Sequence, residues 1–118
     1  MNAFETKVAN AARLFLDRKG YSVIDIAWAD PGGAGGFDIV AEDEGAIVFL
    51  DVLAEEDAES FPQEAIDRAQ HEILAAHWLA TADDELIDKP VRFDTIAFLV
   101  VGESRALLRH HINALSEE

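Results

Sequence analysis

Asp38 and Asp51 are the two residues whose type and spacing suggest chemistry most directly. They stand in two apolar, β-rich segments, 37–42 and 46–53, on either side of a short turn. If residues 44–45 are the loop of a tight hairpin, Asp38 faces Asp51 across the two strands. Opposed side chains have Cβ atoms roughly 4.5–5.5 Å apart, and like charges at such positions are destabilising. The sequence therefore predicts two carboxylates whose repulsion must be offset.

Four arrangements would offset this repulsion. They are a divalent cation with oxygen ligands, a raised pKa of one carboxyl group, a displaced strand register, or solvation at the acidic end of a hairpin. A calcium or magnesium ion with a purely structural role would use the same two aspartates and would need no substrate. The two residues alone leave these alternatives open.

Other residue types give weaker signals. The chain has no cysteine, which excludes disulfides, thiol catalysis and thiolate metal sites. Adjacent His110 and His111 diverge on a strand or a helix, and His71 and His77, six residues apart, do not share a helix face. We therefore interpret all four histidines as solvent-facing or partly buried. Glycines of residues 32–36 lack the Gly-Lys-Ser/Thr sequence that a phosphate loop needs.

The charge balance bears on possible partners. The chain of 118 residues has 9 Lys and Arg against 24 Asp and Glu, a formal net charge of −15. Residues 20–67 contain 13 acids and no Lys or Arg, so a surface formed there repels phosphate. We expect nucleic acid to be an unfavourable partner. The apolar runs are too short to cross a bilayer and no signal pattern begins the chain, so we expect a cytoplasmic protein without membrane contact.

The elements that must position these residues follow from hydrophobic periodicity and turn signals. A single domain over residues 1–118 is expected, with strand residues Ile24, Ile26 and Trp28 on one face and both Trp28 and Trp78 in the core. Residues 105–115 favour a hairpin strand, with a short helix as the alternative. The order α-β-β-β-α-β-β predicts an α/β fold with a central mixed sheet flanked by helices. The expected elements are a helix at about 3–19, strands at 22–28, 37–42 and 46–53, a helix at about 61–80 capped by Ser60 with Gln63, and strands at 93–101 and 105–115.

Several short motifs, in this order, resemble the YraN-like family of small bacterial proteins, which has the restriction-endonuclease-like fold. The family pattern is a helix ending in Gly-Tyr, a strand with Asn-Trp-Arg, then Gly-Glu-(Ile/Leu)-Asp, Phe-(Val)-Glu-Val-Lys, a helix, and a late Arg-Phe-Asp strand. The resemblance covers most of the chain. The matching segments here are Gly20-Tyr21, Ala27-Trp28-Ala29, Gly35-Gly36-Phe37-Asp38, Phe49-Leu50-Asp51-Val52-Leu53, Arg92-Phe93-Asp94 and Ile112-Asn113-Ala114-Leu115.

The departures from this pattern concern charged positions. In families of this fold the Asp and the Glu hold Mg²⁺ and the Lys positions or activates the attacking water. Asp38 matches the Asp, Asp51 replaces the Glu, and Leu53 stands in the Lys position. The resemblance thus implies a vestigial catalytic site. Further charged or polar family residues are replaced by Gly36, by Ala9, Ala27 and Ala29, and by Glu55 in an Arg position.

Two functions of different classes follow from the resemblance. The first is a non-catalytic, acidic interaction module that binds an unknown protein through the acidic hairpin and the residues from Ala54 to Glu59. The alternative is a Mg²⁺-dependent endonuclease or DNA-processing hydrolase that acts on DNA ends or junctions, with Arg68 as a migrated cation. We expect no cofactor, with Mg²⁺ or Mn²⁺ at Asp38 and Asp51 if the vestigial site binds metal. The sequence does not indicate an oligomeric state.

Overall fold

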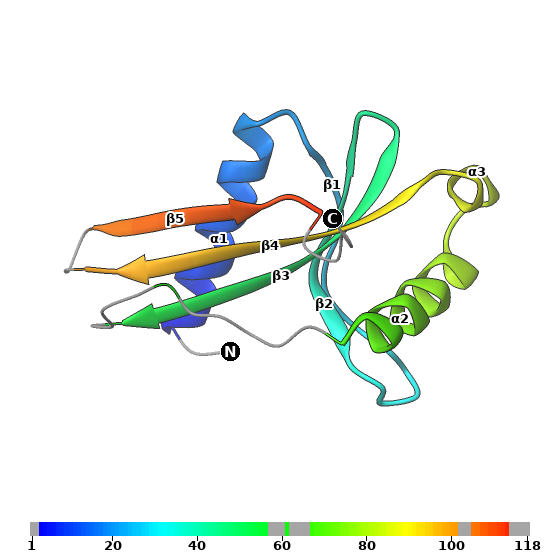
Figure 1. The fold of residues 1–118 in the computed structure, drawn as a ribbon, viewed down its shortest axis with the longest axis horizontal. Helices are drawn as coiled ribbons and strands as arrows, with labels where there is room; N and C mark the ends of the chain where they lie inside the picture. Colours follow the sequence, from blue (N-terminus) through cyan, green and yellow to red (C-terminus); the bar gives the residue numbers. More distant parts are fainter. Residues whose placement is uncertain (1–2, 57–60, 62–66, 102–104, 114–118) are drawn as a thin grey trace.

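The computed structural model describes residues 3–56, 61, 67–101 and 105–113. It contains a five-stranded mixed sheet in the order β1-β2-β3-β4-β5, in which β3 and β4 are parallel and the other neighbours are antiparallel (Figure 1). This confirms the predicted α/β architecture. The described elements are α1 (Ala3–Arg18), β1 (Ser22–Ala29), β2 (Gly36–Asp43), β3 (Ala46–Glu56), α2 (Arg68–Thr81), α3 (Asp84–Ile87), β4 (Val91–Val100) and β5 (Ala106–His111).

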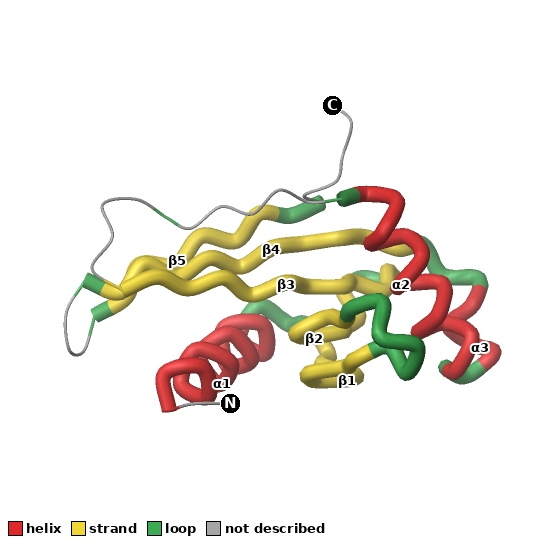
Figure 2. The backbone as a smooth tube through the Cα atoms, turned by 90° about the horizontal axis from the view of Figure 1, so that it is seen from below, coloured by secondary structure: helices red, strands yellow, loops and turns green. Residues whose placement is uncertain are grey.

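Helices cover the sheet from two sides, as predicted. Figure 2 shows α1 beneath the sheet, whereas α2 lies against the half formed by β1, β2 and the starts of β3 and β4. The α1 side buries Ala12 and Leu16 against residues such as Ile39, Leu50 and Ile96. The α2 side buries Phe37, Val40, Ile47, Phe49, Leu74, Ala75 and Trp78. Burial of these two apolar clusters is the main force that fixes the helices on the sheet.

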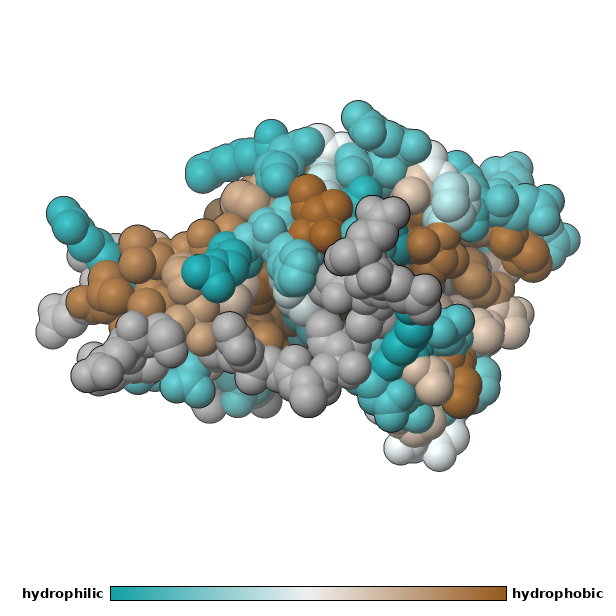
Figure 3. All heavy atoms as spheres, in the orientation of Figure 1, coloured by the Kyte–Doolittle hydropathy of each residue, from teal (hydrophilic) through white to brown (hydrophobic). Residues whose placement is uncertain are grey.

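The last strand resolves the ambiguity of the C-terminal segment. Residues 106–111 form β5, which pairs with β4 as an antiparallel hairpin partner. Figure 3 shows an apolar surface at its left, where β4 and β5 lie in the same orientation in Figure 1. Leu107 of β5 is 52% exposed. None of the described helices is long and apolar enough to cross a membrane.

The predicted helices need two corrections. Helix α2 begins at Arg68 rather than near residue 61, because Asp67 has an extended backbone and its carboxylate accepts a hydrogen bond from the Gln70 N–H at 3.2 Å. The predicted capping residues Ser60 and Gln63 lie outside the described part of the chain. The short helix α3 was not predicted, since four residues carry too little periodicity to be recognised.

Strand β1 departs from the predicted alternation. Its pairing with β2 shifts register between Val23 and Asp25, and Ala27 has a positive φ of 53°. As a result, Ile26 faces the α1 side while Trp28 packs in the cluster beneath α2. The prediction that Ile24, Ile26 and Trp28 share one face is therefore wrong. Both tryptophans pack against the core, as predicted.

Candidate functional site

The register of the β2–β3 hairpin agrees with the sequence arithmetic up to the predicted site. Ala41 pairs with Val48 and Ile39 pairs with Leu50, but the described ladder ends there. Asp38 is therefore not paired with Asp51. Its Oδ2 instead accepts a hydrogen bond from the Val52 N–H at 2.7 Å.

Asp51 has a different partner. Its Oδ2 lies 2.6 Å from Nε2 of His71 on helix α2. The other ring nitrogen of His71, Nδ1, is 3.1 Å from the carbonyl oxygen of Asp67. Both ring nitrogens thus face oxygen atoms. The contact therefore gives Asp51 a partner on helix α2.

The two carboxylates consequently have separate surroundings. Asp51 lies against α2, whereas Asp38 lines a cavity beside α1. Within the ranges that the structure describes, no group of three or more His, Asp or Glu residues could hold a metal ion. The prediction that Asp38 and Asp51 face each other is therefore wrong, because the paired ladder ends at Ile39 and Leu50 and each aspartate has its own partner.

The cavity beside α1 has a volume of about 280 Å³. Asp38 and Glu5 are its two acidic residues, and the other side chains are apolar. Two alanines in its lining, Ala9 and Ala27, stand where the resemblance places polar or charged family residues. The cavity is therefore an apolar hollow with carboxylates. Its lining residues are Phe4, Glu5, Val8, Ala9, Ile26, Ala27, Asp38, Ile39, Val52 and Ala54.

Gly36, which stands in a family Glu position, has no space for a side chain. A Cβ atom built there would lie 2.1 Å from the carbonyl oxygen of Trp28 and 3.0 Å from the Cα of Ala29. The backbone of β1 thus occupies the place of a side chain at residue 36. Strands β1 and β2 thus approach closely at the position where the family has a Glu.

Arg68, the cation considered from the sequence, does not take the place of the family Lys. Leu53 pairs with Ala97 of β4. Arg68, the candidate for a migrated cation, lies 3.4 Å from Glu72 in an exposed ion pair on α2. Arg109, which pairs with Ala97 from the other side, has its guanidinium 4.5 Å from the ring centroid of Phe61.

The acidic hairpin is the β2–β3 turn with Glu42, Asp43 and Glu44, and two of these carboxylates have basic partners. Lys89 Nζ lies 2.7 Å from Glu42, and Arg92 Nη1 lies 3.1 Å from Asp43. Glu44 at the turn is exposed. Residues 54–56 continue strand β3 instead of starting the expected interaction loop, and residues 57–59 lie outside the described part of the chain.

Two further histidines have aspartate partners. His77 Nδ1 lies 3.1 Å from Asp30 in the glycine-rich loop, and His110 Nε2 lies 2.8 Å from Asp94. The prediction that solvent or partial burial accounts for all four histidines thus missed three histidine–aspartate contacts. No spacing signal could have found them, because the partners are 16 to 47 residues apart.

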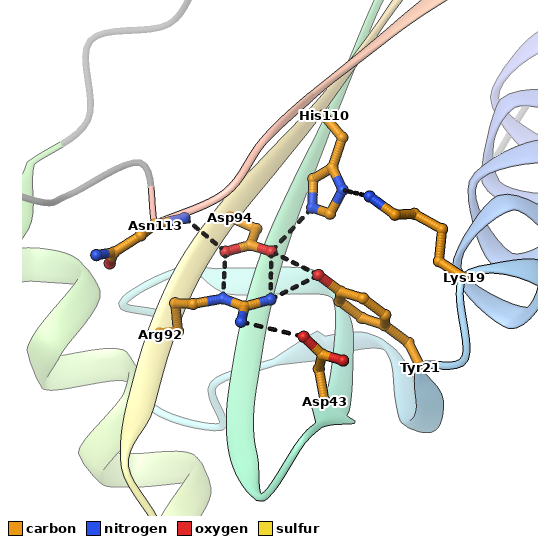
Figure 4. Close-up of polar contacts among 7 residues, drawn as sticks. All are labelled: Lys19, Tyr21, Asp43, Arg92, Asp94, His110 and Asn113. Carbon is orange, nitrogen blue, oxygen red and sulfur yellow. Dashed lines mark hydrogen bonds and ion pairs between the residues drawn. The ribbon is translucent and has the colours of Figure 1, made fainter.

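The most buried polar cluster surrounds Asp94 (Figure 4), whose side chain is fully buried. Arg92 donates to both of its oxygens, from Nε at 2.9 Å and from Nη2 at 3.0 Å. The Asn113 N–H donates to Oδ1 at 2.9 Å. Nδ1 of His110 is 3.3 Å from Lys19 Nζ, which can only donate, so Nε2 carries the proton that His110 gives to Asp94.

The pKa values in this cluster follow from burial and pairing. Burial alone would raise the pKa of Asp94, but hydrogen bonds from His110, Arg92 and the Asn113 N–H together hold that pKa below its ordinary value. Burial, and then the negative charge of Asp94, raise the pKa of Tyr21 to about 12. The Tyr21 hydroxyl accepts from Arg92 Nη2 at 2.6 Å. The cluster is thus an ionised Asp–Arg pair beside a neutral tyrosine.

This cluster unites motifs that lie far apart in the sequence. Tyr21, Arg92, Asp94 and Asn113 all come from the segments that carry the family resemblance. They tie the end of α1 to β4 and to the end of β5. No buried side-chain nitrogen or oxygen in the described residues lacks a hydrogen-bond partner. The arrangement is that of a structural network, since its members satisfy one another.

Comparisons with known proteins show similarity over most of the chain. Residues 9–98 match the uncharacterised protein family UPF0102. The chain is also 32% identical over 103 residues to a UPF0102 protein of Trichlorobacter lovleyi, and this match covers 85% of the chain and 80% of the relative.

Proposed function

The chain belongs to the UPF0102 family, and we propose that it is a member without hydrolase activity that acts as an acidic protein-interaction module. The observation that carries this proposal is that Asp38 and Asp51 contact different groups. Asp38 accepts from the Val52 N–H, and Asp51 contacts His71. These contacts hold the carboxylates apart, since Asp38 lines the cavity beside α1 and Asp51 lies against α2, so that one ion could use both only if a side chain moved.

The surroundings of Asp38 support the same proposal. Metal-assisted hydrolysis needs a polar site that positions water and neutralises developing charge. Here the cavity beside Asp38 has apolar walls, and Leu53 stands in the position of the family lysine. Gly36 is closed by the backbone of Trp28, so a Glu could not return there without moving β1.

The charge distribution supports a protein rather than a nucleic acid as the partner. Phosphate contacts through Lys and Arg supply most of the affinity of non-specific DNA binding. The chain has a net charge of −15, and Lys89 and Arg92 already contact Glu42 and Asp43. A partner with a basic surface complements this charge and would associate faster because of it.

One observation favours the alternative, a Mg²⁺-dependent endonuclease acting on DNA ends or junctions. His71 places a protonatable group 2.6 Å from Asp51, and such a group could take over part of the role of a lysine. This reading needs His71 to leave Asp51 before a metal ion binds. We therefore rank it second.

The proposal predicts no metal-dependent cleavage of DNA. With Mg²⁺ or Mn²⁺, the purified protein is expected to cleave linear, branched and single-stranded DNA no faster than the Asp38→Ala/Asp51→Ala double variant does. The physical reason is that the two carboxylates have separate surroundings and that Leu53 stands in the position of the lysine that would position or activate water. The rate of product formation on labelled DNA is the measurement.

A His71→Ala variant is the matched control for the alternative. Cleavage that requires Mg²⁺ and that disappears in the double variant would contradict the proposal. If His71→Ala also removed that cleavage, the nuclease reading with His71 in the place of the lysine would replace it.

A further inference from the structure

We propose that the cavity beside α1 receives the side chain of a lysine from a basic segment of a partner protein. This inference rests on the proposed function, because it names the chemistry by which the interaction module would recognise its partner. It is carried by the combination of apolar walls with two carboxylates in one hollow of about 280 Å³.

The cavity is built by three elements of the sheet and one helix. Strands β1, β2 and β3 form one wall through residues such as Ile26, Ile39 and Val52, and the first turns of α1 form the other through Phe4 and Val8. Ile39 is buried, whereas the others are partly or largely exposed, so the hollow is apolar at its base and open to solvent.

The charged groups of the cavity are both acidic. Glu5 comes from α1 and Asp38 from β2, both side chains are exposed, and none of the described Lys, Arg or His residues lines the cavity. A lysine combines an aliphatic stem, which packs on apolar surface, with an ammonium group that donates three hydrogen bonds. Carboxylate oxygens accept several hydrogen bonds each, so both acids can bind an ammonium group in addition to their present partners.

The size of the cavity indicates one side chain. Pockets for drug-sized ligands have volumes of roughly 300–1,000 Å³, and this cavity lies just below that range. Its two carboxylates would repel the phosphates of a nucleotide. An extended lysine side chain is narrow enough to lie along the apolar wall.

The neighbouring surface favours a lysine within a protein over a free amine. Ala54 of the cavity is followed on β3 by Glu55 and Glu56, both exposed. These acids would attract further basic residues of the same segment. A free amine cannot use them, so the inference predicts that a peptide binds more tightly than an isolated alkylammonium ion.

The test uses the full-length chain and an oligolysine peptide, with binding followed by fluorescence anisotropy and by amide chemical shifts. The peptide is expected to shift the amide signals of cavity residues, and its Nε-acetylated counterpart, which has no ammonium groups, is expected not to bind. The Glu5→Gln/Asp38→Asn variant should weaken binding by about tenfold or more, because charge-assisted hydrogen bonds are lost. The Ala9→Leu variant keeps every charge but fills the cavity, and it should weaken binding to a similar extent.

The matched control removes two acids elsewhere. Asp84→Asn/Glu85→Gln on α3 makes the same change in net charge away from the cavity and should alter the affinity by no more than about twofold, since distant exposed charges are screened. The proposal that the cavity is the binding site would be contradicted if the control and the Glu5/Asp38 variant lost affinity for the peptide equally. Full affinity of the Ala9→Leu variant would contradict it as well. Equal affinity for n-pentylammonium and for the peptide would overturn the protein partner. DNA cleavage would instead contradict the proposed function, so the two failures are distinguishable.

Discussion

Replacement of Asp94 by asparagine is expected to lower the free energy of unfolding by about 3–5 kcal/mol. The side chain is fully buried and accepts hydrogen bonds from Arg92, His110 and the Asn113 N–H. Asparagine keeps the shape but not the charge, so Arg92 would remain in a largely buried position with Asp43 as its other carboxylate partner. Urea-induced unfolding followed by circular dichroism measures the change.

The same variant has a spectroscopic signature. Tyr21 is the chain's one tyrosine, and its pKa is raised to about 12 by burial and then by Asp94. The ultraviolet absorbance of tyrosinate should therefore appear near pH 12 in the folded protein, and at a lower pH in Asp94→Asn. Because the folded pKa lies above the unfolded value of 10.0, the associated stability is present below pH 10 and is lost as the pH rises towards 12.

Asp84→Asn is the matched control for Asp94→Asn, since Asp84 is an exposed aspartate on α3. It should change the free energy of unfolding by no more than about 0.5 kcal/mol. The structural role of the Asp94 cluster would be contradicted if both substitutions had the same small effect. A tyrosinate titration near pH 10 in the folded wild-type protein would also contradict the buried position of Tyr21.

Substitution of Gly36 by alanine is expected to destabilise the protein by at least about 2 kcal/mol, towards the upper end of the usual range for overpacking. The new Cβ would lie 2.1 Å from the Trp28 carbonyl oxygen, which belongs to the backbone and cannot rotate away. Gly36→Glu, which restores the family residue, should destabilise the protein at least as much. Thermal and urea unfolding of the two variants measure the effect.

Gly32→Ala serves as the control, since Gly32 lies in the glycine-rich loop that precedes β2. A Cβ atom at Gly32 would meet the side-chain oxygen of Asp30 at 3.1 Å, so this carboxylate has to give by only a few tenths of an ångström. Its effect on the free energy of unfolding should be below about 1 kcal/mol. A Gly36→Glu protein as stable as the wild type would show that β1 yields easily and that the family site could be rebuilt.

The parts of the fold that were predictable are those with strong local signals. The hairpin loop at residues 44–45 set the register of β2 and β3 as far as Ile39 and Leu50. The β-branched run before residue 101 gave strand β4, and alternation beyond it gave β5. Apolar stripes placed α1 and α2 on the sheet. These signals are local because each depends on residues that are near one another in the chain.

The parts that were not predictable depend on distant contacts. Strand β1 loses its alternation at a register shift and at Ala27, whose positive φ no residue type in the sequence demands. The start of α2 at Arg68 coincides with the Asp67 cap, whereas the predicted start was based on Ser60 and Gln63, which lie outside the described residues.

The surroundings of the two aspartates were predictable only in part. Hairpin geometry placed Asp38 and Asp51 on neighbouring strands, but the expectation that they face each other was wrong, because the paired ladder ends at Ile39 and Leu50. Their partners, the Val52 N–H and His71, could not be inferred, because His71 reaches Asp51 from a helix 20 residues further along the chain. The cavity beside Asp38 depends on the placement of α1.

Diffraction from crystals soaked with Mn²⁺ tests the central claim, that the two aspartates do not form a working metal site, most directly. The anomalous signal of Mn²⁺ locates the ion independently of any assumed site. We expect no ion shared by Asp38 and Asp51, with Asp38 still bound to the Val52 N–H and Asp51 still bound to His71. An ion that takes an oxygen ligand from each of the two carboxylates, with His71 displaced, would contradict the claim and support the endonuclease.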